Sequence, residues 1–398
     1  MSKQLLRHRT ASDRTWLLPT VQVMMVALLL LTGCASVRLA DGSPDNAASP
    51  PAVMDARELI VLTATPVERL VAGAEARGYV VQAIHPLAEL DDVLVVFRIP
   101  EGRTIPEAIE EIEAAVPGVT AGAHHLYQIQ SSIPSGRDYA GGLIQWPENG
   151  CVASQPVGLI DAGVSPEHPG LIDGRIAQRR FISGNAPPAT DHGTVMADLL
   201  IGPGRLRGGR LYSANVVDPA QGRGDMAGVV SILRAVDWMR SNGVSIINIS
   251  LAGPRNRLMN RALGRAAEAK MVFVAAAGNL GPDAPPQYPA AFPFVLAVTA
   301  VDRDRNVYRD AIRGGHIDLA APGVDILIES EGRLRVKSGT SVAAPFVTAV
   351  LAAKPSASIP DINTAREKLQ SRAIDLGEPG PDPVYGAGLV MAPPTCFG

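Results

Sequence analysis

The sequence predicts an α/β protein: a doubly wound, mostly parallel sheet with helices on both faces, preceded by a small α+β domain of ferredoxin-like type. Short apolar strands alternate with helical stretches between residues 151 and 392. These strands are near-continuous apolar runs, which is typical of parallel sheets covered on both faces. Upstream, residues 54–130 follow the order β-α-β-β-α-β of a split βαβ unit.

Composition narrows the possible functions. The chain has 398 residues, enough for two or three domains, and its 46% apolar and 19% charged residues exclude wholesale disorder. The chain has 36 basic and 39 acidic residues. This balance argues against a nucleic-acid-binding protein, which would usually carry an excess of basic residues. The three cysteines fit no zinc motif. We therefore expect neither a metal nor a cofactor.

The N-terminal residues have the pattern of a targeting segment. Four basic residues precede the uncharged stretch 16–33. Its strongly apolar part, Val23 to Leu31, is short for a membrane-spanning helix and suits a signal peptide. The stretch ends in Leu31-Thr32-Gly33-Cys34, which resembles the lipobox of bacterial lipoproteins.

This resemblance implies a lipoprotein signal peptide over residues 1–33 and lipid on Cys34. Residues 34–53 are then expected to form a flexible tether. Ala35, which stands where Asp would retain a lipoprotein at the inner membrane, favours the periplasmic face of the outer membrane in a Gram-negative host. The alternative is a plain signal peptide or anchor with an incidental cysteine.

The small domain is acidic, with 12 acids and 5 arginines in residues 54–130. Its pattern predicts three strands, two helices and a last extended piece. In chain order these are strand 58–64, helix 66–78, strands 79–87 and 91–99, helix 104–118 and the piece 124–130. The adjacent His124 and His125 are not expected to share a metal, because neighbours in a strand point to opposite faces.

The main domain places polar residues where its strands end. Its predicted strands cover residues 155–161, 210–218, 244–252, 271–279 and 292–302. Asp161 and Asn279 end two of them, His192 precedes an apolar helix, and Ser341 opens another helix. Functional residues of open α/β sheets gather at the carboxyl ends of the strands. Taken singly, however, such residues are more often helix caps or loop residues.

Together these residues resemble the subtilisin-like serine peptidases. The order Asp, His, Ser is that of the subtilisin triad, and Gly-Thr-Ser-Val-Ala-Ala-Pro at 339–345 and Ala-Ala-Gly-Asn at 276–279 are specific motifs of the family. The resemblance implies a peptidase domain over 131–398, with its core at 151–392, and an inhibitory propeptide over 54–130. Ala162, Val195 and Val342 depart from frequent family residues, but none removes a group that the mechanism needs.

The resemblance also implies roles for the site residues. Ser341 is expected to be the nucleophile of a serine endopeptidase, His192 its base, and Asp161 the group that orients the imidazole. Asn279 is expected to donate to the oxyanion. An extended peptide substrate would pair with two backbone edges; the matching residues are Gly222, Gly224, Ser250, Leu251, Ala252, Gly253, Ala277 and Gly278. These glycines could also be plain turn residues.

Three further expectations follow. The chain is expected to cut itself between residues 127 and 150, with its own propeptide as a partner. Because lipid on Cys34 leaves two thiols in an oxidising envelope, Cys151 and Cys396 are expected to form a disulfide, with two free thiols as the alternative. A catalytically inactive scaffold protein of the same fold, or a hydrolase of esters, remains the rival function.

Overall fold

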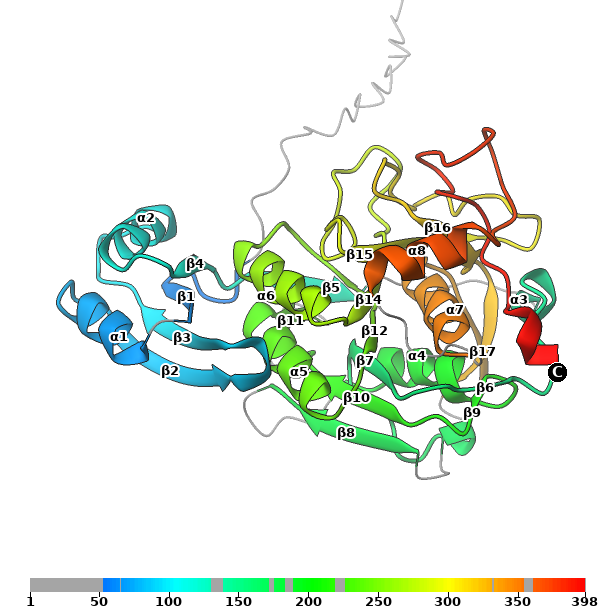
Figure 1. The fold of residues 1–398 in the computed structure, drawn as a ribbon, viewed down its shortest axis with the longest axis horizontal. Coiled ribbons are helices and arrows are strands. Elements are labelled where there is room, and N and C mark those ends of the chain that lie inside the picture. Colours follow the sequence, from blue (N-terminus) through cyan, green and yellow to red (C-terminus); the bar gives the residue numbers. More distant parts are fainter. Residues whose placement is uncertain are drawn as a thin grey trace, which may run out of the picture. The chain divides into compact units, whose positions relative to one another are not determined.

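The structure, a computed structural model, describes most of the chain beyond residue 52 (Figure 1). The described residues are 53–64, 66–129, 139–171, 175–182, 189–218, 226–330, 333–353 and 361–397. The predicted signal peptide, Cys34 and nearly all of the tether lie outside them. Within this part of the chain, no helix combines the length and apolar character needed to cross a membrane.

The small domain has the predicted ferredoxin-like topology. Its elements are β1 (Glu58–Thr63), α1 (Val67–Glu75), β2 (Val80–Leu87), η1 (Ala88–Leu90), β3 (Asp92–Arg98), α2 (Ile105–Ala115) and β4 (Thr120–Ala123). They form one antiparallel sheet in the order β2-β3-β1-β4. The last strand of this sheet is β4, whereas the sequence predicted it at 124–130, a piece that instead joins a different sheet. Helix α2 begins at a capping box, in which Thr104 and Glu107 satisfy each other's backbone amides.

Strand β1 is apolar on both faces because the sheet is covered on both faces. Leu59 and Val61 belong to the small domain's own core, which includes residues of α1 and α2. Ile60 and Leu62 point the other way and join a core cluster of the main domain. Alternation along the strand thus distributes one short sequence between two cores.

The main domain contains the predicted parallel sheet. Its strands are β7 (Val157–Asp161), β8 (Ile176–Arg180), β10 (Leu211–Asn215), β12 (Ile246–Ile249), β14 (Val272–Ala276), β15 (Val295–Val301) and β16 (Leu319–Pro322). Their order is β16-β15-β14-β12-β7-β10-β8, with parallel pairing throughout. The chain therefore runs to one edge, returns, and crosses to the other side of β7.

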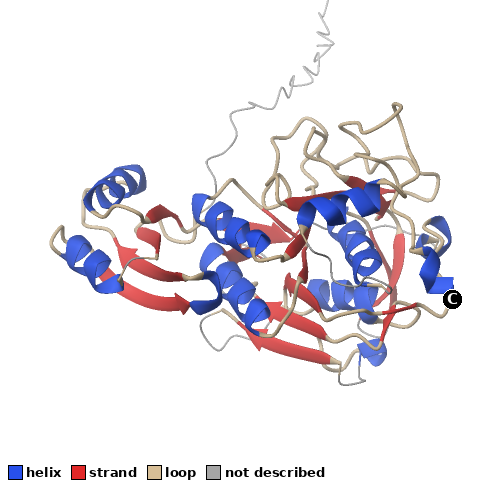
Figure 2. Ribbon diagram, in the orientation of Figure 1, coloured by secondary structure: helices blue, strands red, loops and turns tan. Residues whose placement is uncertain are grey.

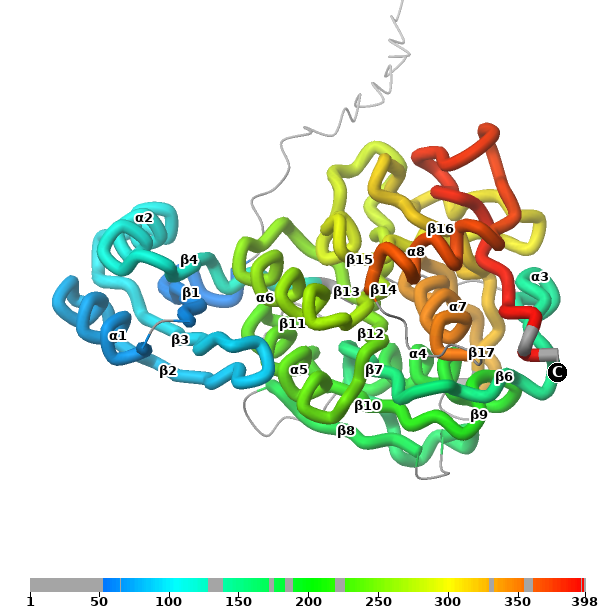
Figure 3. The backbone as a smooth tube through the Cα atoms, viewed as in Figure 1, coloured from blue at the N-terminus to red at the C-terminus, as the bar shows by residue number. Residues whose placement is uncertain are grey.

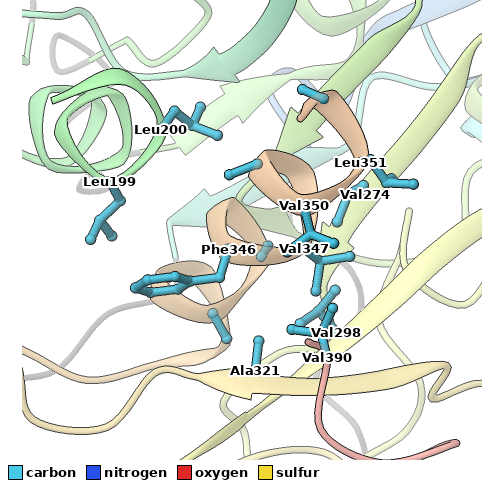
Figure 4. Packing of buried hydrophobic residues seen from close by; sticks show 14 of the residues in the cluster. Leu199, Leu200, Val274, Val298, Ala321, Phe346, Val347, Val350, Leu351 and Val390 are labelled. Carbon is cyan, nitrogen blue, oxygen red and sulfur yellow. The ribbon is translucent and has the colours of Figure 1, made fainter. Parts of the chain in front are cut away.

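Helices cover both faces of this sheet (Figure 2). One core cluster joins the sheet to α4 (Asp191–Ile201) and α7 (Thr340–Ala352), and a second joins its other face to α5 (Val229–Ser241) and α6 (Arg257–Glu268). Helix α7 is buried along its whole length. Phe346, Val347 and Leu351 pack among side chains of the sheet and of α4 (Figure 4). The helix that carries Ser341 is therefore held rigidly.

Smaller elements complete the main domain. They are α3 (Ala140–Leu143), β6 (Cys151–Val152), η2 (Pro169–Leu171), β9 (Leu206–Arg207), β17 (Ile326–Ser330), β18 (Arg333–Lys337), α8 (Ile362–Gln370) and η4 (Pro394–Phe397). A third sheet consists of β11 (Met226–Gly228), β5 (Leu126–Ile129) and β13 (Leu251–Ala252), with β5 in the middle.

The C-terminal segment is placed next to the start of the main domain (Figure 3). The Cα atoms of Cys151 and Cys396 lie 5.1 Å apart, and their sulfur atoms are joined as a disulfide. Cys151 is buried in β6, whereas Cys396 is partly exposed in η4. This separation suits a disulfide without backbone movement.

Removing this bridge is expected to lower the free energy of unfolding by about 2–4 kcal/mol, because the bridge restricts a very long loop in the unfolded chain. We propose to compare Cys396→Ala with the parent chain by urea unfolding, both in a Ser341→Ala background that prevents self-digestion. A reductant should destabilise only the parent. Thiol titration that finds both cysteines free in the oxidised protein would contradict the prediction.

Candidate active site

Asp161 and His192 meet at the carboxyl end of the sheet. Asp161 is the last residue of β7 and is completely buried, and His192 is the second residue of α4. The Nδ1 atom of His192 lies 2.6 Å from Oδ1 of Asp161. The same carboxylate oxygen accepts the backbone amide of Ala162 at 2.7 Å. An imidazole that donates from Nδ1 presents an unprotonated Nε2, which can accept a proton.

Gly193 allows His192 to come close enough to Asp161 for this contact. A side chain at this position would place its Cβ 2.2 Å from the carbonyl oxygen of Ala162. The start of α4 therefore packs directly on the backbone that follows Asp161, as only glycine allows. The helix already begins at Asp191, one residue before His192, whereas the sequence predicted His192 just ahead of the helix.

Ser341 lies in the first turn of α7 and is completely buried. Its carbonyl cannot receive the usual helical hydrogen bond, because the residue four positions later is Pro345, which has no amide hydrogen. The hydroxyl of Ser250 donates to this carbonyl instead, at 3.1 Å. The segment after β12 is thereby attached to the nucleophile's own peptide unit.

Asn279 is attached to the residue before Ser341. Its Oδ1 accepts the backbone amide of Thr340 at 3.0 Å and the hydroxyl of Thr340 at 2.9 Å. The hydroxyl oxygen of Thr340 in turn accepts the amide of Gly278 at 3.0 Å. These bonds fix the side-chain amide, so that its Nδ2 group faces away from Thr340.

The structure brings the four predicted residues to one edge of the sheet, but not all of the hydrogen bonds expected between them are formed. The four are Asp161, His192, Ser341 and Asn279. Among the described residues, Nε2 of His192 is buried without a hydrogen-bond partner, so it is not bonded to the Ser341 hydroxyl. Contacts of this kind are often long in unliganded enzymes and tighten when substrate binds. The hydrogen bond between His192 and Asp161, by contrast, is already present.

The chain's own segment β5 lies between β11 and β13, and β13 directly follows Ser250. Tyr127 pairs with Ala227 of β11, and Gln128 pairs with Ala252 of β13. Both pairings are antiparallel. An extended segment is thus held between two backbone edges, which is the β-addition mode of peptide recognition.

Only one of the two predicted edges lies within the described residues. Leu251 and Ala252 form β13 as expected. Gly222 and Gly224 lie outside the described residues, and the edge that pairs with β5 on that side is Met226–Gly228. The residues of Met226–Gly228 run directly into the apolar helix α5, so the sequence does not mark them as a separate strand.

Tyr127 was not singled out from the sequence, although it fills a closed pocket. Its side chain is completely buried and its hydroxyl donates to the carbonyl of Pro254 at 3.2 Å. A side chain on Gly253 would place its Cβ 2.5 Å from the ring, so glycine is required there. Burial raises the pKa of the Tyr127 phenol, which keeps it protonated as a donor.

Small residues line the remaining part of the predicted subsite. Ala252 and Ala277 are buried, and Gly278 has a φ of 109°, a backbone conformation that favours glycine. No group of three or more His, Cys, Asp or Glu side chains within the described ranges is arranged to hold a metal ion.

Together, the fold and this site define a subtilisin-like peptidase domain. Residues 154–388, more than half of the chain, match the model of the subtilase family, Peptidase_S8. The chain therefore belongs to this family, which confirms the resemblance seen in the sequence.

Individual relatives agree with this assignment. The chain is 30% identical to subtilisin DY of Bacillus licheniformis over 256 residues, which are 60% of this chain and 89% of the relative. It is 28% identical to the minor extracellular protease Epr of Bacillus subtilis (strain 168) over 248 residues, 59% of this chain but only 37% of that protein. The fold is similar to that of fervidolysin from Fervidobacterium pennivorans, with a TM-score of 0.66, 24% identity and coverage of 84% of this chain and 60% of fervidolysin.

Proposed function

We propose that the protein is a serine endopeptidase that hydrolyses peptide bonds through an acyl-enzyme. Ser341 attacks the carbonyl carbon, and His192 takes the serine proton and returns it to the leaving amine. Asp161 keeps the imidazole proton on Nδ1 and stabilises the imidazolium. The 2.6 Å contact between His192 and Asp161 carries the proposal, because it directs Nε2 away from the carboxylate.

A fluorophosphonate probe tests the proposal. Labelling of Ser341, located by mass spectrometry, together with cleavage of casein, is the expected result. A protein that binds the probe nowhere would instead be an inactive scaffold of the same fold. Hydrolysis of short-chain esters without any cleavage of casein would favour the esterase alternative, because a serine peptidase also hydrolyses esters.

The second part of the proposal is that the chain is a zymogen. Residues 54–130 act as its inhibitory propeptide, and the chain cuts itself between residues 127 and 150. The support is the position of β5, whose last residue, Ile129, pairs with Leu251 next to Ser250. Because Ser250 contacts the peptide unit of Ser341, we expect the cut near the start of this interval.

Two arginines of α6, Arg261 and Arg265, bind Asp92 of the proposed propeptide. We call this group of three residues the Asp92 clamp. Arg261 donates to both oxygens of the Asp92 carboxylate, at 2.8 and 3.2 Å, and Arg265 lies 2.7 Å from one of them. The Asp92 side chain is completely buried, whereas the side chains of Arg261 and Arg265 are 17% and 34% exposed. Both arginines also donate to backbone carbonyls of the small domain.

Asp92→Ala is expected to weaken the hold of the cleaved propeptide by about 2–3 kcal/mol, or about 30- to 150-fold in affinity. The value lies below that of a fully buried pair because water reaches the arginines. The measurement is the lag between self-cleavage and the onset of casein hydrolysis, which should shorten. Asp91→Asn is the matched control, since Asp91 is its exposed neighbour and has a φ of 51°, a left-handed conformation that asparagine tolerates. Equal lags in the two variants would contradict the role of the Asp92 clamp in holding the cleaved propeptide.

The third part of the proposal is a lipid anchor on Cys34, on the periplasmic face of the outer membrane. It is supported by the lipobox-like sequence and by the charged and apolar segments before it. Cys34→Ser is expected to abolish lipid attachment and signal cleavage by the lipoprotein route. Mass spectrometry of protein extracted from membranes checks this. A soluble parent protein without fatty-acid mass would refute the anchor.

A further inference from the structure

A buried lysine lies next to the candidate catalytic residues. Lys337 is the last residue of β18 and only 9% exposed. Its Nζ lies 3.0 Å from Oδ2 of Asp191, whose side chain is 42% exposed. Lysine is seldom buried unless its charge is paired. The ion pair therefore accounts for the position of Lys337 in the domain.

The pair joins the two segments that must meet for catalysis. Lys337 precedes the proposed nucleophile, Ser341, by four residues, and Asp191 is the direct neighbour of the proposed base, His192. The two partners are 146 positions apart in the chain, so nothing local brings them together.

The backbone between Lys337 and Ser341 is fixed at several points. Ser338 accepts the amide of Asp325 at 2.8 Å and donates to the Asp325 carboxylate at 3.2 Å. Gly339 donates its amide to the carbonyl of Gly323 at 2.7 Å. A displacement at Lys337 is therefore transmitted to the start of α7 rather than absorbed by a loose loop.

We propose that the Lys337–Asp191 ion pair is a positioning device for the proposed hydrolysis, an inference that rests on the proposed function. Neither residue performs a chemical step. The pair holds the start of α4, with His192, at a fixed distance from the segment that ends in Ser341. A misplacement of about 1 Å between such groups costs about 100-fold in rate.

Single and double substitutions of the pair test the inference in the full chain after it has processed itself. The rate of fluorophosphonate labelling of Ser341 is measured, together with kcat and KM on a chromogenic peptide. Lys337→Met and Asp191→Asn should each slow labelling about 10-fold or more and lower kcat while KM stays close to that of the parent chain, because the pair positions groups that act in the chemical step. The combined substitution should be no slower than either single one, because both remove the same contact, and Lys337→Arg should retain the parent rate.

The outcomes separate this inference from the proposed function. If the parent protein is not labelled at Ser341, the proposed function fails. If the parent is labelled and both single variants keep its labelling rate and its kcat, the positioning role is wrong. A fall in melting temperature with kcat unchanged also overturns it, because a purely structural pair would produce only that. Lys368→Met, at the surface of α8, controls for loss of a lysine charge.

Discussion

Replacing Ser341 with alanine is expected to leave the full-length chain uncut and to lower kcat by about 10⁶-fold, the loss known from the subtilisin triad rather than derived from this chain. Without the hydroxyl, His192 has no nucleophile to activate, and only binding and oxyanion stabilisation remain. The precursor should therefore accumulate at its full mass after signal removal. Mass spectrometry of protein made in a protease-free system measures this directly.

Ser241→Ala is the matched control, since Ser241 is an exposed residue at the end of α5. That variant should be processed like the parent chain. If the Ser341→Ala chain is trimmed at the same place and rate as the parent, the cut is made by another protease and self-processing is wrong.

Asn279→Leu is expected to lower kcat by about 100- to 1000-fold while KM changes little, a magnitude again known from subtilisin and not from this chain. The Nδ2 group is proposed to donate to the oxyanion, which exists only in the transition state and its intermediates. Loss of such a donor reduces kcat and kcat/KM together. Steady-state kinetics on a chromogenic peptide measures both constants.

Asn279→Asp separates the two roles of this side chain. The carboxylate keeps an oxygen that can accept from Thr340, as Oδ1 of Asn279 does. It also replaces the Nδ2 donor with an oxygen that repels the oxyanion. Activity close to that of the parent chain would show that Asn279 only orders the start of α7.

The sequence was most informative where burial leaves little choice. Strands that are buried on both faces of a sheet must be apolar along their whole length. For this reason β7, β12, β14 and β15 could be recognised from apolar runs alone. The residues that end β7 and β14 could then be placed at one edge of the sheet. The ferredoxin-like order of the small domain was equally visible, because its strands and helices alternate within 77 residues.

Other features depend on contacts between distant segments. Strand β8 is an edge strand with the sequence IAQRR, whose polar residues give no apolar signal. The pocket of Tyr127 requires Gly253 and Pro254, which follow more than 120 residues later. The partner of Lys337 could not be inferred, because a lysine before a helix is ordinarily a surface residue.

The positions of the three cysteines have a consequence for where the mature enzyme resides. Cys151 and Cys396 both follow the proposed cut, and Cys34 precedes it, so no disulfide can span it. A lipid on Cys34 then stays with the propeptide. If the chain carries the proposed lipid and makes the proposed cut, the peptidase domain stays at the membrane only for the lifetime of a non-covalent complex, which includes the contacts of Asp92 with Arg261 and Arg265. On a membrane with many anchored propeptides, rebinding to neighbouring propeptides would retain the peptidase domain. On a membrane with few of them, the released domain would diffuse away.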